Sequence, residues 1–321
     1  MSRPNPELAM CYSAEVFADY RLLCKEHGAT MSLKAFAALW ERIHDVPAKR
    51  PKTVRAMDLA FVASTGKETA DIRTQLQAWD EEEAGVWEQE LFTQKTRLNR
   101  AERALETKIT KKAQEDVRIA GNKIERAMRK IAALRNREMG KASSRIFPGV
   151  HGPVIISSKG KRLVVPMRYQ CRPAGKPASY DRRYPGTYNA RRDNLEGFWA
   201  GQFGHTHAVM VASRFYENVE GPNGENQVLE FQPRTGEPML IACLWSHWKD
   251  PKSIEPDLLS FAAITDEPEP EVAAAGHDRT IVNIKPEHLD AWLNPDPRNL
   301  DALYAILDDK RHPFYEHRIA A

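Results

Sequence analysis

The stretch HAVMVASRFYE (residues 207–217) is a long apolar run rich in side chains that favour β-strands. Six further runs of this kind follow Pro148, separated by Gly, Pro and Asn: VIISS (154–158), LVVPMRY (163–169), VLEFQP (228–233), MLIACLW (239–245), LLSFAAIT (258–265) and TIVNI (280–284). GPNGENQ (221–227) joins two of them as a hairpin loop. Strands this close together, with no helices between them, predict a mostly antiparallel, barrel-like or sandwich-like β-domain.

Helices are expected on both sides of these strands. Two short amphipathic helices are predicted between residues 12 and 45: AEVFADYRLLCKEHG, ended by Gly28, and SLKAFAALWERI, with Ser32 as its N-cap. Two more are predicted near the C-terminus: EHLDAWLN after Pro286, and NLDALYAILDD from Asn299. The predicted fold class is therefore α+β.

The segment 51–143 differs from the rest of the chain in its composition and in the spacing of its apolar residues. The chain has 21 prolines, yet none lies between Pro51 and Pro148. Apolar residues recur there at steps of three or four, in one narrow stripe that predicts a long helix with a coiled-coil seam. The stripe consists of Leu98, Ala101, Leu105, Ile109, Ala113, Val117, Ala120, Ile124, Met128, Ile131 and Leu134. Residues 67–92, which carry EEE at 81–83, are a candidate antiparallel partner.

The overall charge is nearly balanced, but its distribution is not. The chain has 47 Lys and Arg against 44 Asp and Glu, a net charge of +3 that by itself predicts no nucleic-acid partner. Residues 95–137 hold fourteen basic and five acidic side chains, a net charge of +9. Two interpretations stay open: a solvated helical face, or a basic arm for nucleic acid or protein. A protein partner or self-association through the 67–140 helices is accordingly expected as one alternative.

Composition excludes several classes of protein. No apolar run approaches the roughly 18–20 residues that span a bilayer, so no membrane partner is expected. The start MSRPNPELAM lacks the apolar core of a signal peptide. The four cysteines (Cys11, Cys24, Cys171 and Cys243) include no CxxC pair, which argues against a disulfide scaffold and a four-thiolate zinc site. We expect a cytoplasmic protein without a cofactor.

Residues 159–214 combine eleven basic with three acidic side chains, and aromatic residues are interleaved with them. Guanidinium groups neutralise phosphates and aromatic faces stack on unpaired bases, a combination suited to single-stranded nucleic acid. A solvated loop with buried aromatic anchors is the competing interpretation. The candidate DNA-binding side chains are Arg168, Arg172, Arg191, Arg192, Arg214 and Trp199.

Several single residues are candidates for chemistry, although each also has a structural interpretation. Cys11 precedes the first predicted helix, Glu217 ends the SRFYE strand, and Asn189 lies in YNARRD. His277 lies in AGHDRT between two strands. His205 and His207 alternate along one strand as a candidate metal pair, but no third ligand is evident and no metal site is predicted.

The order of these motifs resembles one known family. A Met-Cys near the start is followed by Pro148-Gly149, NAR (189–191), FYE (215–217) and GHDR (276–279) before a β-strand. This pattern is similar to the SOS-response-associated peptidase (SRAP) family, whose members covalently trap abasic sites in single-stranded DNA. The likeness covers Met10–Ser13 and then Ser144–Pro313, with the proline-free block as an insertion.

The resemblance implies roles for individual residues. Cys11 would be the crosslinking residue, Asn189 would orient the reacting aldehyde, and Glu217 with His277 would handle protons. Arg191 would grip the DNA backbone beside the lesion, with the abasic strand as the partner and a nucleoid-associated location. The chemistry requires a free α-amine on Cys11, because an N-terminal cysteine offers both an amine and a thiol for a five-membered thiazolidine. Translation from Met10, or removal of the preceding residues, would supply that amine.

Four parts and three functions follow as expectations. Residues 1–9 are an extension absent or removed from the active protein, 10–50 carry the crosslinking Cys and two helices, 51–143 are the helical insertion, and 144–321 are the β-rich catalytic and DNA-binding domain. The favoured function is an SRAP-type enzyme that forms a DNA–protein crosslink, with hydrolase and lyase classes both open. The alternatives are a thiol (auto)peptidase that uses Cys11, with His277 as base, and a non-enzymatic interaction protein that uses the helical insertion.

Overall fold

The computed structural model describes residues 13–16, 20–40, 50–138, 144–221, 223–250 and 255–320. The chain divides into two compact units. The first comprises Met1–Leu39, Pro51–Ala60 and Gly140–Ala321, and the second comprises Trp40–Arg50 and Phe61–Met139. Within the described residues no helix is long and apolar enough to cross a membrane.

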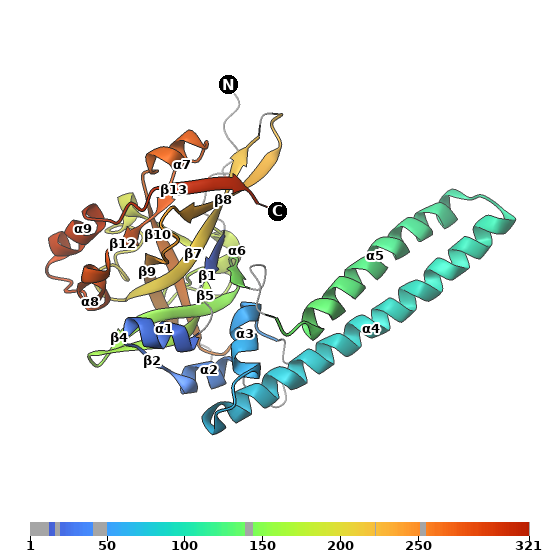
Figure 1. Cartoon of the computed structure of the whole chain (residues 1–321), viewed down its shortest axis with the longest axis horizontal. Coiled ribbons are helices and arrows are strands. Elements are labelled where there is room, and N and C mark those ends of the chain that lie inside the picture. Colours follow the sequence, from blue (N-terminus) through green and yellow to red (C-terminus); the bar gives the residue numbers. More distant parts are fainter. Residues whose placement is uncertain are drawn as a thin grey trace. The chain divides into compact units, whose positions relative to one another are not determined.

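The first unit is built on a 13-stranded sheet within the described part of the chain (Figure 1). Its strands are β1 (Ser13–Val16), β2 (Thr30–Met31), β3 (Arg145–Ile146), β4 (His151–Ser158), β5 (Lys161–Tyr169), β6 (Asn189–Arg191), β7 (His207–Glu220), β8 (Asn226–Pro233), β9 (Met239–Trp248), β10 (Leu258–Asp266), β11 (Thr280–Ile281), β12 (Asn283–Ile284) and β13 (Tyr315–Ile319). Six of the seven expected strands form as single strands, whereas TIVNI (280–284) is split at Val282 into β11 and β12. Strands β7 and β8 pair antiparallel on either side of the predicted hairpin loop, whose last two residues, Asn226 and Gln227, belong to β8.

The sheet is mostly antiparallel and curls into a partial ring. Strand β7 pairs antiparallel with β4 and β9, while β9, β10 and β5 lead back to β4. The ring is partial because β10 and β5 share only the parallel pairs Ser260↔Arg168 and Phe261↔Tyr169. The predicted α+β fold class with a barrel-like β-domain is confirmed. The β-domain is a partial ring of strands, which is less regular than a clean barrel.

One predicted helix is partly wrong. The expected helix over residues 14–28 begins only at α1 (Tyr20–His27), and Ser13–Val16 form strand β1 instead. This strand lies between β7 and β3, and the side chains of Ser13, Ala14 and Val16 are buried. The helical preference of so short a segment is weak. The backbone hydrogen bonds of β1 to strands on both sides, together with the burial of its side chains, outweigh that preference.

The remaining helices of the first unit are short. They are α2 (Leu33–Trp40) and α3 (Arg55–Val62), which reach into the second unit, and α6 (Tyr180–Arg183), α7 (Pro270–Ala274), α8 (Leu289–Leu293) and α9 (Leu300–Asp308). Gly28 has φ +57°, as expected for a left-handed helix end. Asn299 caps α9, since its side chain accepts a hydrogen bond from the Ala302 amide at 3.3 Å.

The second unit contains a helical hairpin made of α4 (Ala70–Thr107) and α5 (Lys111–Arg135) (Figure 1). The predicted antiparallel pairing is confirmed by the Arg97–Asp116 ion pair near the turn and the Lys123–Glu90 ion pair farther from it. The prediction of one unbroken helix across the stripe is wrong. The backbone turns at residues 108–110, because Thr110 is extended and its side chain caps α5 by accepting from the Ala113 amide.

The hairpin buries part of the predicted stripe. Its residues Ala101, Ala113, Ala120 and Ile131 are buried, and so is Ala127, which was not predicted as part of the stripe. Ile109 and Met128 were expected in the seam, yet they are 75% and 54% exposed. The turn moves Ile109 out of the helix, and Met128 lies next to Ala127 on a helix whose partner covers only one face.

Candidate active site

A buried acid–imidazole pair lies in the first unit. Glu217 is on β7, where it pairs with Leu229 of β8, and its side chain is fully buried. His277 follows the left-handed Gly276 (φ +93°) in the loop after α7. The Oε2 atom of Glu217 lies 3.2 Å from Nε2 of His277, whose side chain is 1% exposed. The chain therefore brings together two of the residues singled out by the sequence.

The surroundings of His277 fix the position of its proton. Nδ1 lies 2.8 Å from the carbonyl oxygen of Arg279, closer than the 3.3 Å contact with the Arg279 amide, so we assign Nδ1 as the donor. Burial lowers the pKa of His277 below its usual range, and the bond to the Arg279 carbonyl partly opposes this. With Nδ1 protonated, the lone pair of a neutral Nε2 would face the carboxylate of Glu217. A proton between Nε2 and Oε2 relieves that repulsion, so the pair can hold and pass one proton.

Asn189 is largely buried at the edge of a surface pocket. Strand β6 places Asn189 beside Ala263 of β10, and its side chain is 7% exposed. It borders a surface pocket of about 350 Å³. Other residues lining the pocket include Arg183, Tyr184, Arg191, Phe198 and Trp199. Tyr184 and Phe198 are 38% and 39% exposed, so aromatic faces and guanidinium groups reach solvent beside Asn189.

Strand β10 connects the pocket with the histidine loop. It pairs with β6 at Thr265↔Arg191 and with β11 at Thr265↔Ile281. Asp193 makes a second link, since its Oδ2 lies 2.7 Å from Arg191 and 4.0 Å from Arg279. The bond from Arg191 lowers the pKa of Asp193 below its usual range. Asp193 and Arg279 lie in the YNARRD and GHDR motifs, but the sequence indicated no role for either, because their contact depends on how β6 and β11 flank one strand.

Cys11 lies outside the described residues, but β1 begins two residues later. Ser13 pairs with Tyr216, the neighbour of Glu217 on β7. Arg145 secures this register, since its Nε donates to Ser13 Oγ at 2.9 Å and its guanidinium lies 3.7 Å from the Tyr216 ring centroid. The sequence did not reveal Arg145, because this contact joins segments that lie far apart along the chain.

The other cysteines are unsuited to nucleophilic chemistry. Cys171 and Cys243 are fully buried and Cys24 is half-buried. Burial raises the pKa of Cys171 to about 12 and raises those of Cys243 and Cys24 as well. A thiol that stays protonated is a poor nucleophile.

Two of the predicted DNA-binding arginines lie in an internal ion-pair network. Arg168 and Arg172 both contact Asp181, at 2.8 and 2.6 Å. Arg172 also lies 3.4 Å from Glu255 and stacks over Trp248 with its guanidinium 4.3 Å from the ring centroid. Burial raises the pKa of Asp181, but the bonds from Arg172 and Arg168 outweigh it and hold the value below the usual range. Either arginine would have to leave this carboxylate to reach a phosphate.

Arg192 and Arg214 also have carboxylate partners. Arg192 lies 3.0 Å from Asp266 of β10. Arg214 lies 2.8 Å from Glu15 of β1 and 2.9 Å from Glu230 of β8, so it ties together the strands on both sides of β7. Arg191 differs from these residues because its side chain is 51% exposed. Trp199 lines the pocket, yet only 3% of it is exposed.

The histidine pair considered from the sequence is not positioned for a metal. His207 is buried, with Nδ1 3.0 Å from the Trp292 carbonyl and Nε2 accepting from the Gly204 amide at 2.9 Å. Burial lowers the pKa of His207 to about 3. Both ring nitrogens are thus occupied by backbone groups, and His205 is exposed. Within the described ranges, no cluster of three or more His, Cys, Asp or Glu side chains could hold a metal ion.

Three solved structures are similar to parts of the chain. One is an X-ray structure of a protein from Bordetella bronchiseptica, with 17% identity and a TM-score of 0.45 over 56% of this chain and 87% of that chain. A protein from Bacteroides thetaiotaomicron has 14% identity and a TM-score of 0.44 over 56% and 78%. A phage-related protein from Bordetella bronchiseptica has 19% identity and a TM-score of 0.42 over 58% and 85%.

Sequence comparison identifies the family. The comparison with curated proteins finds no match. The model of the family described as "SOS response associated peptidase (SRAP)" matches residues 86–319, which is more than half of the chain. The chain therefore belongs to the SOS response associated peptidase (SRAP) family.

Proposed function

We propose that this protein binds single-stranded DNA and traps abasic sites covalently through Cys11. The observation that carries the proposal is the buried contact of 3.2 Å between Glu217 and His277, on the strand that β1 joins beside Tyr216. The membership in the SRAP family, which is associated with the SOS response, supports the same conclusion.

The proposed reaction uses both groups of an N-terminal cysteine. The ring-opened deoxyribose of an abasic site exposes an aldehyde at C1′. The α-amine of Cys11, with a usual pKa of about 7.7–8, attacks this carbon and releases one water to form a Schiff base. The thiol sulfur then adds to the same carbon while the thiol proton passes to nitrogen. The product is a five-membered thiazolidine, and the net change is the loss of one water.

The side chains around β7 would supply the proton transfers. The sugar opens when its ring oxygen gains a proton and its C1′ hydroxyl loses one, and water leaves the Schiff-base precursor when the hydroxyl is protonated. The Glu217–His277 pair can hold one proton and pass it, which suits all three steps. Asn189 would orient the aldehyde oxygen, since its amide borders the open pocket.

The pocket beside Asn189 would receive the DNA strand. Tyr184 and Phe198 offer partly exposed rings for stacking on bases, and Arg191 offers an exposed cation for a phosphate. Arg168, Arg172, Arg192 and Arg214 would act by holding this part of the sheet in place, because carboxylates bind them and each side chain is at most 25% exposed. Arg191 also binds a carboxylate, that of Asp193, but its side chain is 51% exposed.

The proposal requires that Cys11 reach Glu217 with its amine free. Cys11 precedes Ser13 by two residues, and a chain of that length reaches about 7 Å at most. Because Ser13 pairs with Tyr216, the sheet need not rearrange to admit Cys11. The amine is free when the protein starts at Met10 and loses that methionine, or when residues 1–10 are removed.

Incubation of Met10-start protein with single-stranded DNA that carries one abasic site tests the proposal. We expect a slower band on a denaturing gel, absent with Cys11→Ala and with intact DNA of the same sequence. Protein that retains an acetyl group on the Cys11 amine serves as the chemical control and should form no thiazolidine. A stable band from the acetylated protein would overturn the thiazolidine mechanism.

A second candidate function is autoproteolysis before Cys11, as the family name suggests. The same buried pair favours it, because a histidine beside a carboxylate can act as the base in peptide hydrolysis. Intact mass of the full 321-residue chain over time tests this second function. Loss of residues 1–10 that stops with Glu217→Gln would support autoproteolysis, whereas an unchanged mass would exclude it.

A further inference from the structure

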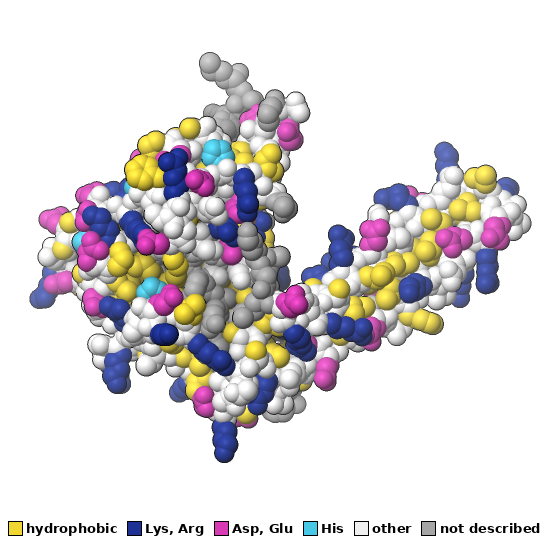
Figure 2. Space-filling view, in the orientation of Figure 1, with side chains coloured by type: hydrophobic (Ala, Val, Ile, Leu, Met, Phe, Trp, Pro, Cys, Tyr) yellow, Lys and Arg dark blue, Asp and Glu magenta, His cyan; other side chains and the backbone are white. Residues whose placement is uncertain are grey.

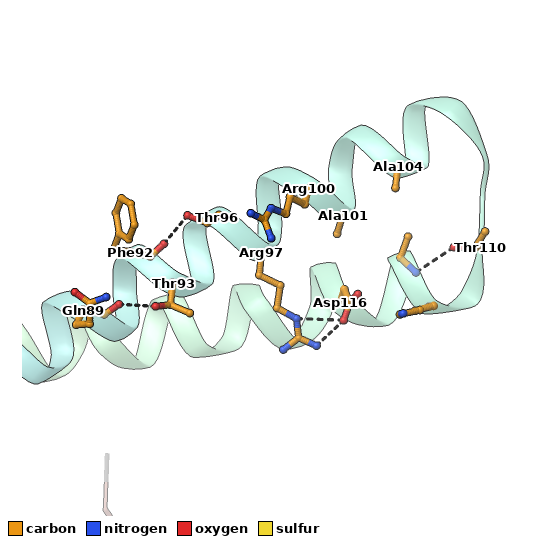
Figure 3. Close-up of a pocket in the computed structure, with 12 residues that line it drawn as sticks. Gln89, Phe92, Thr93, Thr96, Arg97, Arg100, Ala101, Ala104, Thr110 and Asp116 are labelled. Carbon is orange, nitrogen blue, oxygen red and sulfur yellow. Dashed lines mark hydrogen bonds and ion pairs between the residues drawn. The ribbon is translucent and has the colours of Figure 1, made fainter.

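The helical hairpin carries an open groove along one side. Two neighbouring hollows of about 560 and 800 Å³ share Gln89 and Thr93, so they form one continuous groove between α4 and α5. Figure 2 shows hydrophobic side chains along this arm, and Figure 3 shows Phe92 on α4 close to Gln89 and Thr93 in one of the two hollows. Val86 and Phe92 are 64% and 68% exposed, although both are large apolar residues. Exposed apolar side chains that line a groove indicate an interaction surface.

The α4 side of the groove has the spacing of a coiled-coil seam. The lining residues of α4 recur at steps of four and three: Glu82, Val86, Gln89, Thr93, Thr96, Arg100 and Ala104. At 1.5 Å per residue this stripe is about 33 Å long. The buried Gln94 lies outside this stripe, whereas the buried Ala101 borders it and lines the same hollow. The hairpin is thus a pair of helices with an unfilled place for a third.

The charges that line the groove indicate which kind of partner it would bind. Five cations (Arg97, Arg100, Lys112, Lys123 and Arg126) and three anions (Glu82, Glu90 and Asp116) line it, a net charge of +2. Asp116 binds Arg97 and Glu90 binds Lys123. Among the described residues, Arg100 and Lys112 have no acidic partner within ion-pair distance, so the end near the turn offers two free cations beside apolar carbon. A second copy of this groove would oppose positive charge to positive charge.

We propose that the hairpin groove binds an amphipathic, acidic helix of a partner protein. The partner's apolar side chains would lie on Val86 and Phe92, and its carboxylates would pair with Arg100 and Lys112. A nucleic-acid backbone suits the groove less well, because phosphates gain nothing from the exposed rings and methyl groups and meet Glu82, Glu90 and Asp116. The proposal concerns the second unit and does not depend on the crosslinking reaction.

Binding of designed peptides to the full-length protein tests this proposal. The probe is a labelled 21-residue peptide, a length chosen to match the groove, with Leu at heptad positions a and d and Glu at the flanking positions. A second peptide carries Lys in place of each Glu. Fluorescence anisotropy gives both dissociation constants. We expect the Glu peptide to bind at least about 10-fold more tightly than the Lys peptide, with a difference that shrinks at high salt.

Substitutions locate the binding surface. Phe92→Glu is expected to weaken binding of the Glu peptide by about 30-fold, since it places a charge against the apolar face of the helix. Met128→Glu is the matched control, because Met128 is 54% exposed on the same hairpin but does not line the groove, and it should change the dissociation constant less than 2-fold. The double variant Arg100→Glu, Lys112→Glu should reverse the preference and bind the Lys peptide more tightly. This gain of binding cannot come from misfolding.

Four results would overturn the proposal. The first is equal affinity for the two peptides, and the second is a double variant that keeps the wild-type preference. The third is a dimer, measured by light scattering, that Phe92→Glu dissociates, because the groove would then bind a second copy. Undamaged duplex DNA is run in parallel. If Arg100→Glu, Lys112→Glu abolishes duplex binding but leaves peptide binding unchanged, the cations serve nucleic acid instead.

Discussion

Glu217 and His277 meet at 3.2 Å in the interior of the first unit, where their side chains are 0% and 1% exposed. Burial disfavours the charged form of both the carboxylate and the imidazole. A proton shared between the two side chains reduces this cost. The strand carrying Glu217 also pairs with β1, the described element nearest to Cys11 in the sequence.

Glu217→Gln should slow crosslinking by about 100-fold while leaving the fold intact. Gln preserves the shape of the side chain but cannot accept and return a proton, and a general acid–base group contributes about 10²–10⁴ to a rate. The measurement is the initial rate of band formation on a denaturing gel. Glu220→Gln on the same strand is the control, since Glu220 is exposed. Equal rates for Glu217→Gln and the wild type would remove Glu217 from the mechanism.

Acid should destabilise the protein in part through His207. Burial lowers its folded pKa to about 3, whereas the unfolded chain binds the proton near 6.5. Between these values unfolding takes up a proton, so the free energy of unfolding falls with falling pH, by about 1.4 kcal/mol per pH unit for one proton. His207→Gln should flatten this slope between pH 4 and 6 in urea denaturation. The exposed His205→Gln should leave it unchanged, and a wild-type slope in His207→Gln would contradict the assignment.

Arg191 and Arg172 should affect different properties. Arg191→Ala removes an exposed cation beside the pocket, so we expect weaker binding to single-stranded DNA. The slope of the logarithm of the binding constant against the logarithm of the salt concentration should fall in magnitude by about 0.7. The melting temperature should be almost unchanged. Arg172→Ala leaves Asp181 with one partner fewer in a buried network, so we expect a loss of about 2–4 kcal/mol in the free energy of unfolding. Arg182→Ala removes an equal, exposed charge outside the pocket lining as the control for Arg191.

Removal of the distal hairpin should leave the chemistry intact. We expect a chain in which a Gly-Ser linker replaces residues 92–118 to crosslink abasic DNA within about 3-fold of the wild-type rate. The reason is that Asn189, Glu217 and His277 all belong to the first unit. The same deletion removes Phe92, Arg100 and Lys112 and should abolish binding of the acidic peptide. Loss of crosslinking in a variant that keeps its cooperative melting would place part of the reaction on the hairpin.

The sequence predicted the elements whose signal is local. Runs of β-forming residues predicted β4, β5 and β7–β10, and Gly28 and Asn299 marked helix ends because capping depends on a few neighbouring residues. Short strands such as β1, β3 and β6 were missed, since pairing with distant segments stabilises them. The turn at residues 108–110 was missed because the apolar stripe continues through it, although Thr110 carried a capping signal.

The same distinction between local signals and contacts between distant segments applies to the candidate site. Asn189, Glu217 and His277 were found through motif order, and their chemistry was readable from residue type. The sequence could not show whether an arginine faces DNA or a carboxylate. The carboxylates that bind Arg168, Arg172 and Arg214 come from other segments of the chain. They are Asp181, Glu15 and Glu230. The contact between Asp193 and Arg279 was not predicted for the same reason, although both residues lie in motifs that the sequence analysis named.

The intact mass of the covalent complex tests the central claim most directly. Met10-start protein is incubated with a short single-stranded DNA that carries one abasic site, and the product is measured by mass spectrometry with fragmentation. The account predicts the mass of the protein from Cys11 onward plus that of the DNA minus one water, with the DNA on Cys11. An adduct on another residue, or a product from Cys11→Ala at the wild-type rate, would contradict it.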